Sequence, residues 1–164
     1  MADSCEFLVI GAGINGLRIA RELHVLGKRV LCIDREDHIG GMWYTNRYEN
    51  TSCQLHSSKF RYDIFAWQSP IDRPSSAHVL LYLRDFVKTY NLSSIVLLNR
   101  DVRDIAVLDD NRLAVTVCDK RSGTMLALRC DHVIHTSHST KPCRPVQLTC
   151  NPRVRTYHSS ELML

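Results

Sequence analysis

The first 34 residues change from a continuous apolar run to a helical period and back to an apolar run. Residues 7–10 are all apolar, which predicts a buried strand. Apolar residues then recur at three-residue steps over residues 14–26, which predicts an amphipathic helix that ends at Gly27. Residues 29–33 predict a second strand, so residues 6–34 are expected to form a β-α-β unit.

The next segment, residues 35–76, shows no regular period but contains a Gly-Gly pair, prolines and many aromatic residues. Its aromatic content argues against disorder, and a long irregular segment inside a domain is usually functional. Two interpretations stay open, a packed surface loop and a wall around a flat, conjugated ligand. The aromatic residues are Trp43, Tyr44, Tyr48, Phe60, Tyr62, Phe65 and Trp67.

The second half of the chain predicts one more helix and a series of strands. Ser75 or Ser76 can cap a helix over residues 75–91, whose apolar stripe is expected to face the core. Turn residues separate short apolar runs that predict an antiparallel meander, followed by a strand that returns to the parallel sheet. These strands are expected at residues 95–98, 102–108, 113–117, 125–130 and 132–136.

The turn between the first strand and the first helix carries glycines at G-x-G-x-x-G spacing. Gly11 permits a tight turn, Gly13 lets the backbone approach a pyrophosphate, and Gly16 lets the helix pack closely on the strand. The phosphates would lie at the N-terminus of the helix, where free N–H groups favour an anion. Asp34 ends the second strand, where a carboxylate accepts hydrogen bonds from ribose hydroxyls. The fold class expected is therefore α/β, Rossmann-like, with an inserted β-meander.

Composition and charge exclude several classes of protein. The net charge is +4, and the basic residues are scattered without interleaved aromatics, so nucleic-acid binding is not expected. The cysteines are odd in number, irregularly spaced and without a C-x-x-C pair, which favours a reducing compartment. No signal peptide and no membrane span are expected, so the prediction is a cytoplasmic location.

The residues after Asp34 are more specific than the glycine motif. The run Gly-Gly-Met-Trp-Tyr-Thr-Asn-Arg-Tyr at residues 40–48, followed by Cys53, resembles the G-G-x-W-Y-x-N-R-Y-P-G-x-x-C-D motif of class B flavoprotein monooxygenases, and of Baeyer–Villiger monooxygenases in particular. The likeness covers nearly the whole chain but only the first part of the family's length. Further positions that fit the family pattern are Trp67, Tyr82, Leu83, Val102, Tyr157 and His158.

The resemblance implies a cofactor, a reaction and a set of binding residues. In this family NADPH reduces FAD, the reduced flavin forms a peroxyflavin with oxygen, and a small lipophilic ketone or heteroatom substrate is oxygenated. It also implies one FAD-binding domain over residues 1–164, with Rossmann-like parts at 1–94 and 131–164, the meander inserted at 95–130, and no separate NADPH domain. The expected cofactor-binding residues are Gly11, Gly13, Ile14, Asn15, Gly16, Asp34, Arg35, Gly41, Met42, Trp43 and Val102.

The chain departs from the family pattern at functional positions, and these departures raise alternatives. Gln54 replaces the family aspartate near the flavin, so no catalytic residue can be assigned. The closing turn over FAD has no glycine here, and no second G-x-G-x-x-G follows. We therefore expect an unfinished sheet that a second protein chain would complete. The alternative functions are a catalytically inactive, truncated FAD- or nucleotide-binding relative that acts as a binding or regulatory module, and a gene fragment.

The sequence contains features of two further ligand sites, one for NADP and one for zinc. Arg35, next to Asp34, suggests NADP as the ligand in place of FAD, because an arginine can bind the 2′-phosphate of NADP. Asp34 would repel that phosphate. Histidines and cysteines near the end of the chain are possible zinc ligands. If residues 131–135 form a strand, His132 and His135 point to opposite faces, so no metal site is expected. The residues of this cluster are Cys130, His132, His135, His138 and Cys143.

Overall fold

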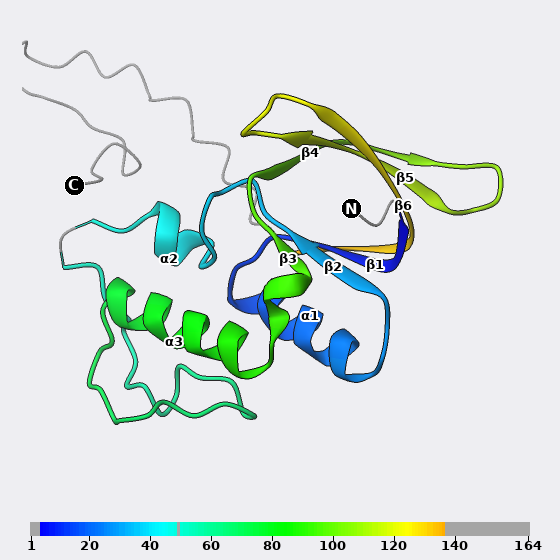
Figure 1. Ribbon diagram of the computed structural model, residues 1–164. Helices are drawn as coiled ribbons and strands as arrows, with labels where there is room; N and C mark the ends of the chain where they lie inside the picture. Colours follow the sequence, from blue (N-terminus) through cyan, green and yellow to red (C-terminus); the bar gives the residue numbers. More distant parts are fainter. Residues whose placement is uncertain (1–3, 49, 137–164) are drawn as a thin grey trace, which may run out of the picture.

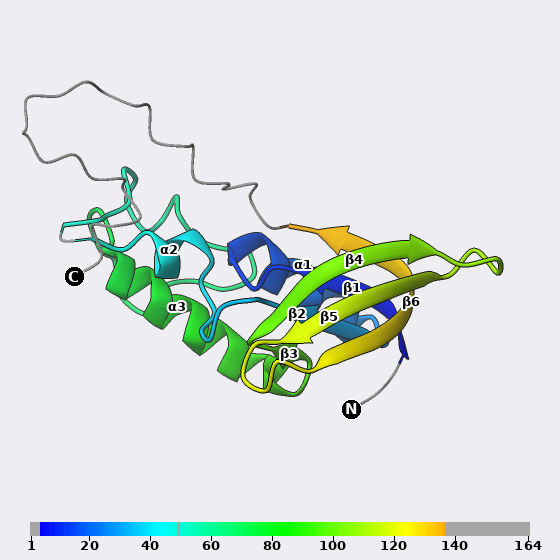
Figure 2. The ribbon, with the colours of Figure 1, turned by 90° about the horizontal axis from the view of Figure 1, so that it is seen from above.

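The computed structural model describes residues 4–48 and 50–136, which form one six-stranded sheet with helices on one face (Figures 1 and 2). The strand order is β3-β2-β1-β6-β5-β4, with β1, β2, β3 and β6 parallel and β4, β5 and β6 antiparallel. The elements are β1 (Ser4–Ile10), α1 (Ile14–Val25), β2 (Val30–Ile33), α2 (Met42–Thr45), α3 (Ser76–Thr89), the 3₁₀ helix η1 (Leu92–Ser94), β3 (Val96–Leu97), β4 (Arg100–Val107), β5 (Leu113–Asp119) and β6 (Met125–His135).

Strand β6 connects the two halves of the sheet. Its residues 125–130 pair with β5 in antiparallel register, and its residues 129–135 pair with β1 in parallel register. The sequence predicted two separate strands here, one in the meander and one in the parallel sheet. Both lie in a single strand of 11 residues, so the meander and the parallel part belong to one continuous sheet. The α/β fold class with an antiparallel meander is confirmed.

The two faces of the parallel strands bury different side chains. On one face, Val9 and Cys32 pack with Leu17 of α1 and Phe86 of α3. On the other face, Leu8 packs with residues of the meander, which curls over the parallel strands (Figure 1). Each strand therefore contributes alternate residues to two apolar layers, as the period of a strand requires.

Helix α3 begins where a capping box fixes its first turn. The Ser75 side chain accepts a hydrogen bond from the backbone N–H of His78, and the His78 ring accepts from the backbone N–H of Ser75. The helix ends before Asn91, whose φ of 52° is left-handed. Of the two residues that the sequence offered as caps, Ser75 is the one used.

The long segment before α3 is a packed loop rather than a ligand wall over most of its length. Tyr62, Phe65 and Trp67 pack against α3, with ring centroids 4.5 Å apart for Tyr62 and Phe86 and also for Trp67 and Tyr82. These rings pack onto the core beneath α3, which favours the packed-loop interpretation for these residues. Isolated β-bridges, including the antiparallel bridge between Ser52 and Ser75, connect parts of the loop to each other and to the start of α3.

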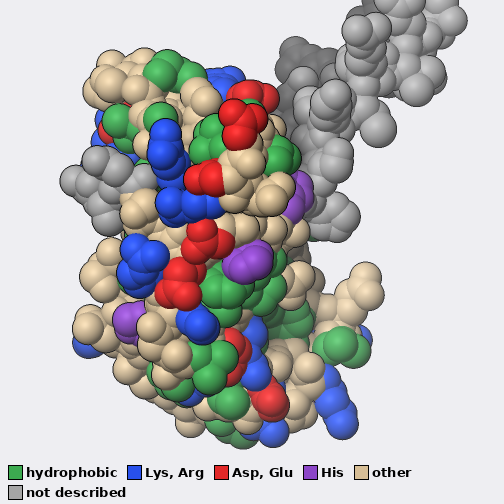
Figure 3. Space-filling model, turned by 90° about the vertical axis from the view of Figure 1, so that its right-hand side faces the viewer, with side chains coloured by type: hydrophobic (Ala, Val, Ile, Leu, Met, Phe, Trp, Pro, Cys, Tyr) green, Lys and Arg blue, Asp and Glu red, His purple; other side chains and the backbone are tan. Residues whose placement is uncertain are grey.

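The surface carries charges of both signs. On the face shown in Figure 3, Lys and Arg side chains are interspersed with Asp and Glu side chains. Among the pairs on the surface, Arg112 Nε lies 2.9 Å from Asp131 Oδ1, and Lys28 Nζ lies 3.5 Å from Glu6 Oε1. Exposed pairs of this kind contribute little to stability. Within the described part of the chain, no helix combines the length and the hydropathy that a membrane crossing demands.

Candidate functional site

A cleft of about 680 Å³ opens at the carboxyl ends of β1, β2 and β6. Ligands of open α/β sheets bind at this end of the strands. Its walls come from the β1–α1 turn, the end of β2, the loop that carries α2, strand β4, and the end of β6 with Thr136. The segments that build it are therefore far apart in the sequence and brought together by the strand order.

The cleft collects the residues that the sequence predicted, with one exception. Gly16 lies beneath the turn, because a Cβ there would overlap the carbonyl oxygen of Gly11 and come within 2.8 Å of Thr136 Oγ1. Its role is the close packing of helix on strand. The predicted residues that line the cleft are Gly11, Gly13, Ile14, Asn15, Asp34, Arg35, Gly41, Met42, Trp43 and Val102.

The N-terminus of α1 faces the cleft with unpaired backbone donors. The N–H of Leu17 donates to the carbonyl oxygen of Gly13 at 3.0 Å, which is the first bond of the helix. The N–H groups of Ile14, Asn15 and Gly16 precede that bond and have no intrahelical acceptor. The first turn contains no acidic residue, and no side chain caps it. This end of the helix can therefore accept an anion.

Asp34 is held beside this turn by two backbone donors. Its Oδ2 accepts from the N–H of Ala12 at 2.6 Å, and its Oδ1 accepts from the N–H of Glu36 at 2.9 Å. The residue is 9% exposed and lines the cleft. Since each carboxylate oxygen offers more than one acceptor site, Asp34 can still accept hydrogen bonds from ligand hydroxyls.

The Gly40–Gly41 pair brings the α2 loop against the glycine turn. Both residues have positive φ, 126° and 55°, which other residues rarely adopt. The N–H of Gly40 donates to the carbonyl oxygen of Ala12 at 2.9 Å. A Cβ on Gly41 would lie only 3.1 Å from the Cα of Gly13. The pair therefore allows two backbones to approach closely at the mouth of the cleft.

Helix α2 places two apolar side chains at the cleft. Trp43 is half-buried and makes an edge-to-face contact with Phe60, with ring centroids 5.3 Å apart. Met42 is 50% exposed. These residues and Tyr48 form an aromatic and apolar part of the cleft wall.

Several residues of the cleft were not predicted from the sequence. Arg100 forms an ion pair with Asp119 at 3.0 Å, and its Nε is buried with no hydrogen-bond partner among the described residues. Thr136 Oγ1 donates to the carbonyl oxygens of Ile10 and Gly11 at 2.9 and 3.1 Å, so it anchors the glycine turn. The remaining lining residues, which were not among the expected cofactor-binding residues, are Ile10, Ile33, Glu36, Gly40, Thr45, Asn46, Tyr48, Thr51, Ser52, Asp101, Ile105 and His135.

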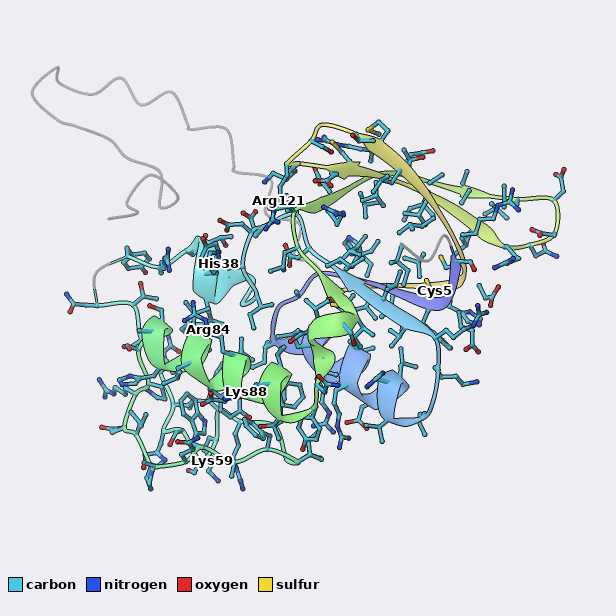
Figure 4. All side chains as sticks on the ribbon, in the orientation of Figure 1. Cys5, His38, Lys59, Arg84, Lys88 and Arg121 are labelled. Carbon is cyan, nitrogen blue, oxygen red and sulfur yellow. The ribbon has the colours of Figure 1, made fainter. Side chains whose placement is uncertain are left out.

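Burial and local hydrogen bonds shift the pKa values of two ionisable groups near the cleft. Burial raises the pKa of Cys32 to about 12, and its thiol donates to the carbonyl oxygen of Gly11 at 3.6 Å, so it is an inert donor beneath the turn. On the loop toward Gly40, hydrogen bonds from His38 and Tyr44 lower the pKa of the Asp37 carboxyl. His38, labelled in Figure 4, also stacks on Tyr44. These contacts give the loop a fixed conformation.

Neither a catalytic residue nor a metal cluster emerges from the described residues. Gln54 is exposed and is not among the residues that line the cleft. No group of three or more His, Cys, Asp or Glu side chains within the described ranges could hold a metal ion. Two members of the candidate zinc cluster, His138 and Cys143, lie outside the described residues, as do Tyr157 and His158.

Comparison with known families and sequences places this cleft in context. The family model of the NAD(P)-binding Rossmann-like domain matches residues 9–79. A protein of Acinetobacter baylyi named "Probable FAD-binding monooxygenase AlmA" is 32% identical over 94 residues, covering 56% of this chain and 19% of that protein. The cyclopentanone 1,2-monooxygenase of Comamonas sp. is 31% identical over 121 residues, covering 70% of this chain and 22% of that enzyme.

Solved structures give the same picture. The closed crystal structure of cyclohexanone monooxygenase superimposes with a TM-score of 0.71 at 27% identity, covering 83% of this chain and 26% of that one. The chain therefore spans about a fifth to a quarter of the length of the proteins that it matches.

Proposed function

We propose that the cleft of this chain, which is similar to flavin monooxygenases over about a fifth to a quarter of their length, binds the ADP half of FAD. The pyrophosphate would lie at the N-terminus of α1, and the adenosine ribose would hydrogen-bond to Asp34. Val102 would meet the adenine through its backbone, while Met42 and Trp43 would lie toward the flavin. This assignment uses the predicted residues that line the cleft together with Gly16 beneath it.

One observation carries the proposal. The unpaired N–H groups of the first turn of α1 and the carboxylate of Asp34 face a single cleft, and the Ala12 N–H joins them by donating to that carboxylate at 2.6 Å. A ligand that satisfies both must carry an anionic group next to neighbouring hydroxyls. A ribose linked to a pyrophosphate has this combination. Gly13 and Gly41 leave room for it, because neither places a side chain at the mouth.

The reaction that we propose is the FAD-dependent oxygenation of a small organic substrate. Bound FAD, reduced by NADPH, would supply the activation of oxygen, and the substrate would be a small lipophilic ketone or heteroatom compound. The residues of this chain would bind and orient the FAD. The α1 turn holds the phosphates, Asp34 holds the ribose, and the apolar wall at Met42 and Trp43 keeps water from the ring.

The test is flavin binding by the purified 164-residue chain. We expect the absorption bands of FAD to remain with the protein after gel filtration, and free ADP to compete with FAD for the site. FMN, which lacks the ADP half, is the matched control ligand and should not be retained. If FAD is neither present after purification nor taken up when added, the proposal is wrong.

A second candidate function follows from Gln54. The family motif that residues 40–53 resemble has an aspartate at the position of Gln54. An amide can neither supply negative charge nor take a proton. On this reading the chain is a catalytically inactive FAD- or nucleotide-binding relative that serves as a binding or regulatory module, with a second protein chain completing its fold. NADPH oxidation in air by the FAD-loaded protein, coupled to oxygenation of a cyclic ketone or a thioether, would reject it.

A further inference from the structure

The side chain of Tyr62 reaches from the loop before α3 to the first turn of α1. Its O–H donates a hydrogen bond to the backbone carbonyl oxygen of Ile14, across 48 residues of sequence. The residue is only 7% exposed, and its ring packs against those of Tyr82 and Phe86. A buried side chain on another element therefore contacts the residue with which the helix begins.

The carbonyl that accepts this bond belongs to a peptide group that faces the cleft. The C=O of Ile14 and the N–H of Asn15 are two ends of the same peptide unit, and Asn15 lines the cleft. A hydrogen bond to the oxygen of an amide polarises it and makes its N–H a stronger donor. That N–H is one of the unpaired donors at the helix N-terminus, where an anion would bind.

The position of Tyr62 is itself fixed from α3. Its backbone N–H donates to the phenol oxygen of Tyr82 at 2.7 Å, and the Tyr82 O–H donates to the carbonyl oxygen of Phe65 at 2.7 Å. Beside it, Asp63 pairs with Arg18 of α1. Burial raises the pKa of Tyr62, so the phenol stays protonated and remains a donor throughout the neutral range.

We propose that Tyr62 is a positioning residue for phosphate binding, acting through the Ile14–Asn15 peptide. This inference rests on the proposed nucleotide function and adds a residue that no glycine motif contains. Tyr62 touches no ligand. It orients and polarises the peptide whose N–H meets the phosphate, so its effect is confined to phosphate-bearing ligands.

The experiment compares ADP with adenosine in the variant Tyr62→Phe. We expect the affinity for ADP to fall about two- to fivefold, while the affinity for adenosine stays within the error of the titration. A role in stability alone would affect both ligands equally. In NMR spectra of the ligand-free protein, the Asn15 amide proton should move upfield, because the Ile14 carbonyl oxygen loses the bond from Tyr62 and keeps only the bond within the helix.

The matched control is Tyr90→Phe. Tyr90 belongs to the same aromatic cluster, and its O–H donates to the carbonyl oxygen of Ile64 at 3.0 Å. Its ring meets α1 at the Arg21 guanidinium, 4.3 Å from the ring centroid, rather than at the first turn of the helix. The control should leave the ADP-to-adenosine affinity ratio unchanged. If Tyr62→Phe does not fold, 3-fluorotyrosine placed at residue 62 keeps the ring and strengthens the donor, and should raise the affinity for ADP only.

The outcomes separate this inference from the proposed function. An unchanged ratio and an unmoved Asn15 resonance in Tyr62→Phe, with wild-type protein binding ADP, would overturn the positioning role alone. If the wild-type protein binds ADP no more tightly than adenosine, the phosphate site is wrong and the proposed function fails first.

Discussion

The carboxylate of Asp34 and the backbone N–H of Ala12 form a 2.6 Å hydrogen bond between the end of β2 and the middle of the glycine turn. The same carboxylate also accepts from the N–H of Glu36. Asp34 therefore does two things at once. It fixes the shape of the turn that faces the cleft, and it presents acceptor sites to a ligand.

We expect Asp34→Asn to weaken both FAD binding and folding. An amide nitrogen cannot accept, so one of the two backbone donors loses its partner or faces the NH₂ group, which should lower stability by about 1–3 kcal/mol. FAD affinity should fall at least tenfold, measured by fluorescence titration below the melting temperature of the variant. Asp109→Asn, at an exposed position between β4 and β5 that does not line the cleft, is the control and should leave FAD affinity unchanged.

The buried thiols predict a loss of stability in alkali. Burial raises the pKa of Cys5, at the start of β1 (Figure 4), to about 11 and that of Cys32 to about 12, from an ordinary value of 9.0. The unfolded chain releases these protons near pH 9 while the folded chain keeps them. The stabilisation is therefore complete below pH 9 and is lost as the pH rises toward 12.

Urea unfolding at a series of pH values tests this prediction. The slope should be at most about 1.4 kcal/mol per pH unit for each thiol. Cys32→Ala should flatten the decline, whereas Cys118→Ala, at a half-buried position, should not. A free energy of unfolding that stays constant between pH 9 and pH 11 would contradict it.

The cap of α3 is the basis of a third prediction. Ser75→Ala removes the acceptor for the His78 N–H and should lower stability by about 1 kcal/mol. Ser76→Ala changes the next residue, which belongs to the helix itself, and should have a smaller effect. Thermal unfolding of both variants separates the cap from the helix propensity of the region; equal shifts would show that the capping box contributes nothing.

The sequence predicted those features of the fold that depend on local pattern. The strand, turn and helix over residues 4–25 follow from a change of apolar period next to glycines, and Asp34 is found by its distance from that motif. The predicted lining residues meet in one cleft because the parallel strand order brings the end of β2 beside the end of β1.

The features that were missed depend on contacts between distant segments. The unbroken β6 was predicted as two strands, because Asp131 interrupts the apolar pattern where its partner strand changes from β5 to β1. Helix α2 has only four residues, too few to show a period. The bond from Tyr62 to Ile14 and the pair of Arg100 with Asp119 join residues that no local rule relates.

Two glycines of the motif should separate folding from binding. A Cβ at Gly16 would overlap the Gly11 carbonyl oxygen, so Gly16→Ala should cost about 4 kcal/mol or more and prevent stable folding. A Cβ at Gly13 would meet Gly41 Cα at 3.6 Å, an ordinary contact, and the φ of Gly13 is −83°. Gly13→Ala should therefore fold with a loss of about 1 kcal/mol. Its FAD affinity should fall at least tenfold, because the methyl group would stand where the pyrophosphate approaches.

Circular dichroism melting and FAD titration on the same samples test this separation. The control is Gly123→Ala, in the turn between β5 and β6, where φ is 73° and a Cβ would meet nothing within 4 Å. This variant should lose about 1 kcal/mol of stability from backbone strain and keep the wild-type FAD affinity. A Gly13→Ala protein that binds FAD as tightly as Gly123→Ala would mean that no ligand approaches the backbone at Gly13, and the phosphate would have to be placed elsewhere in the cleft.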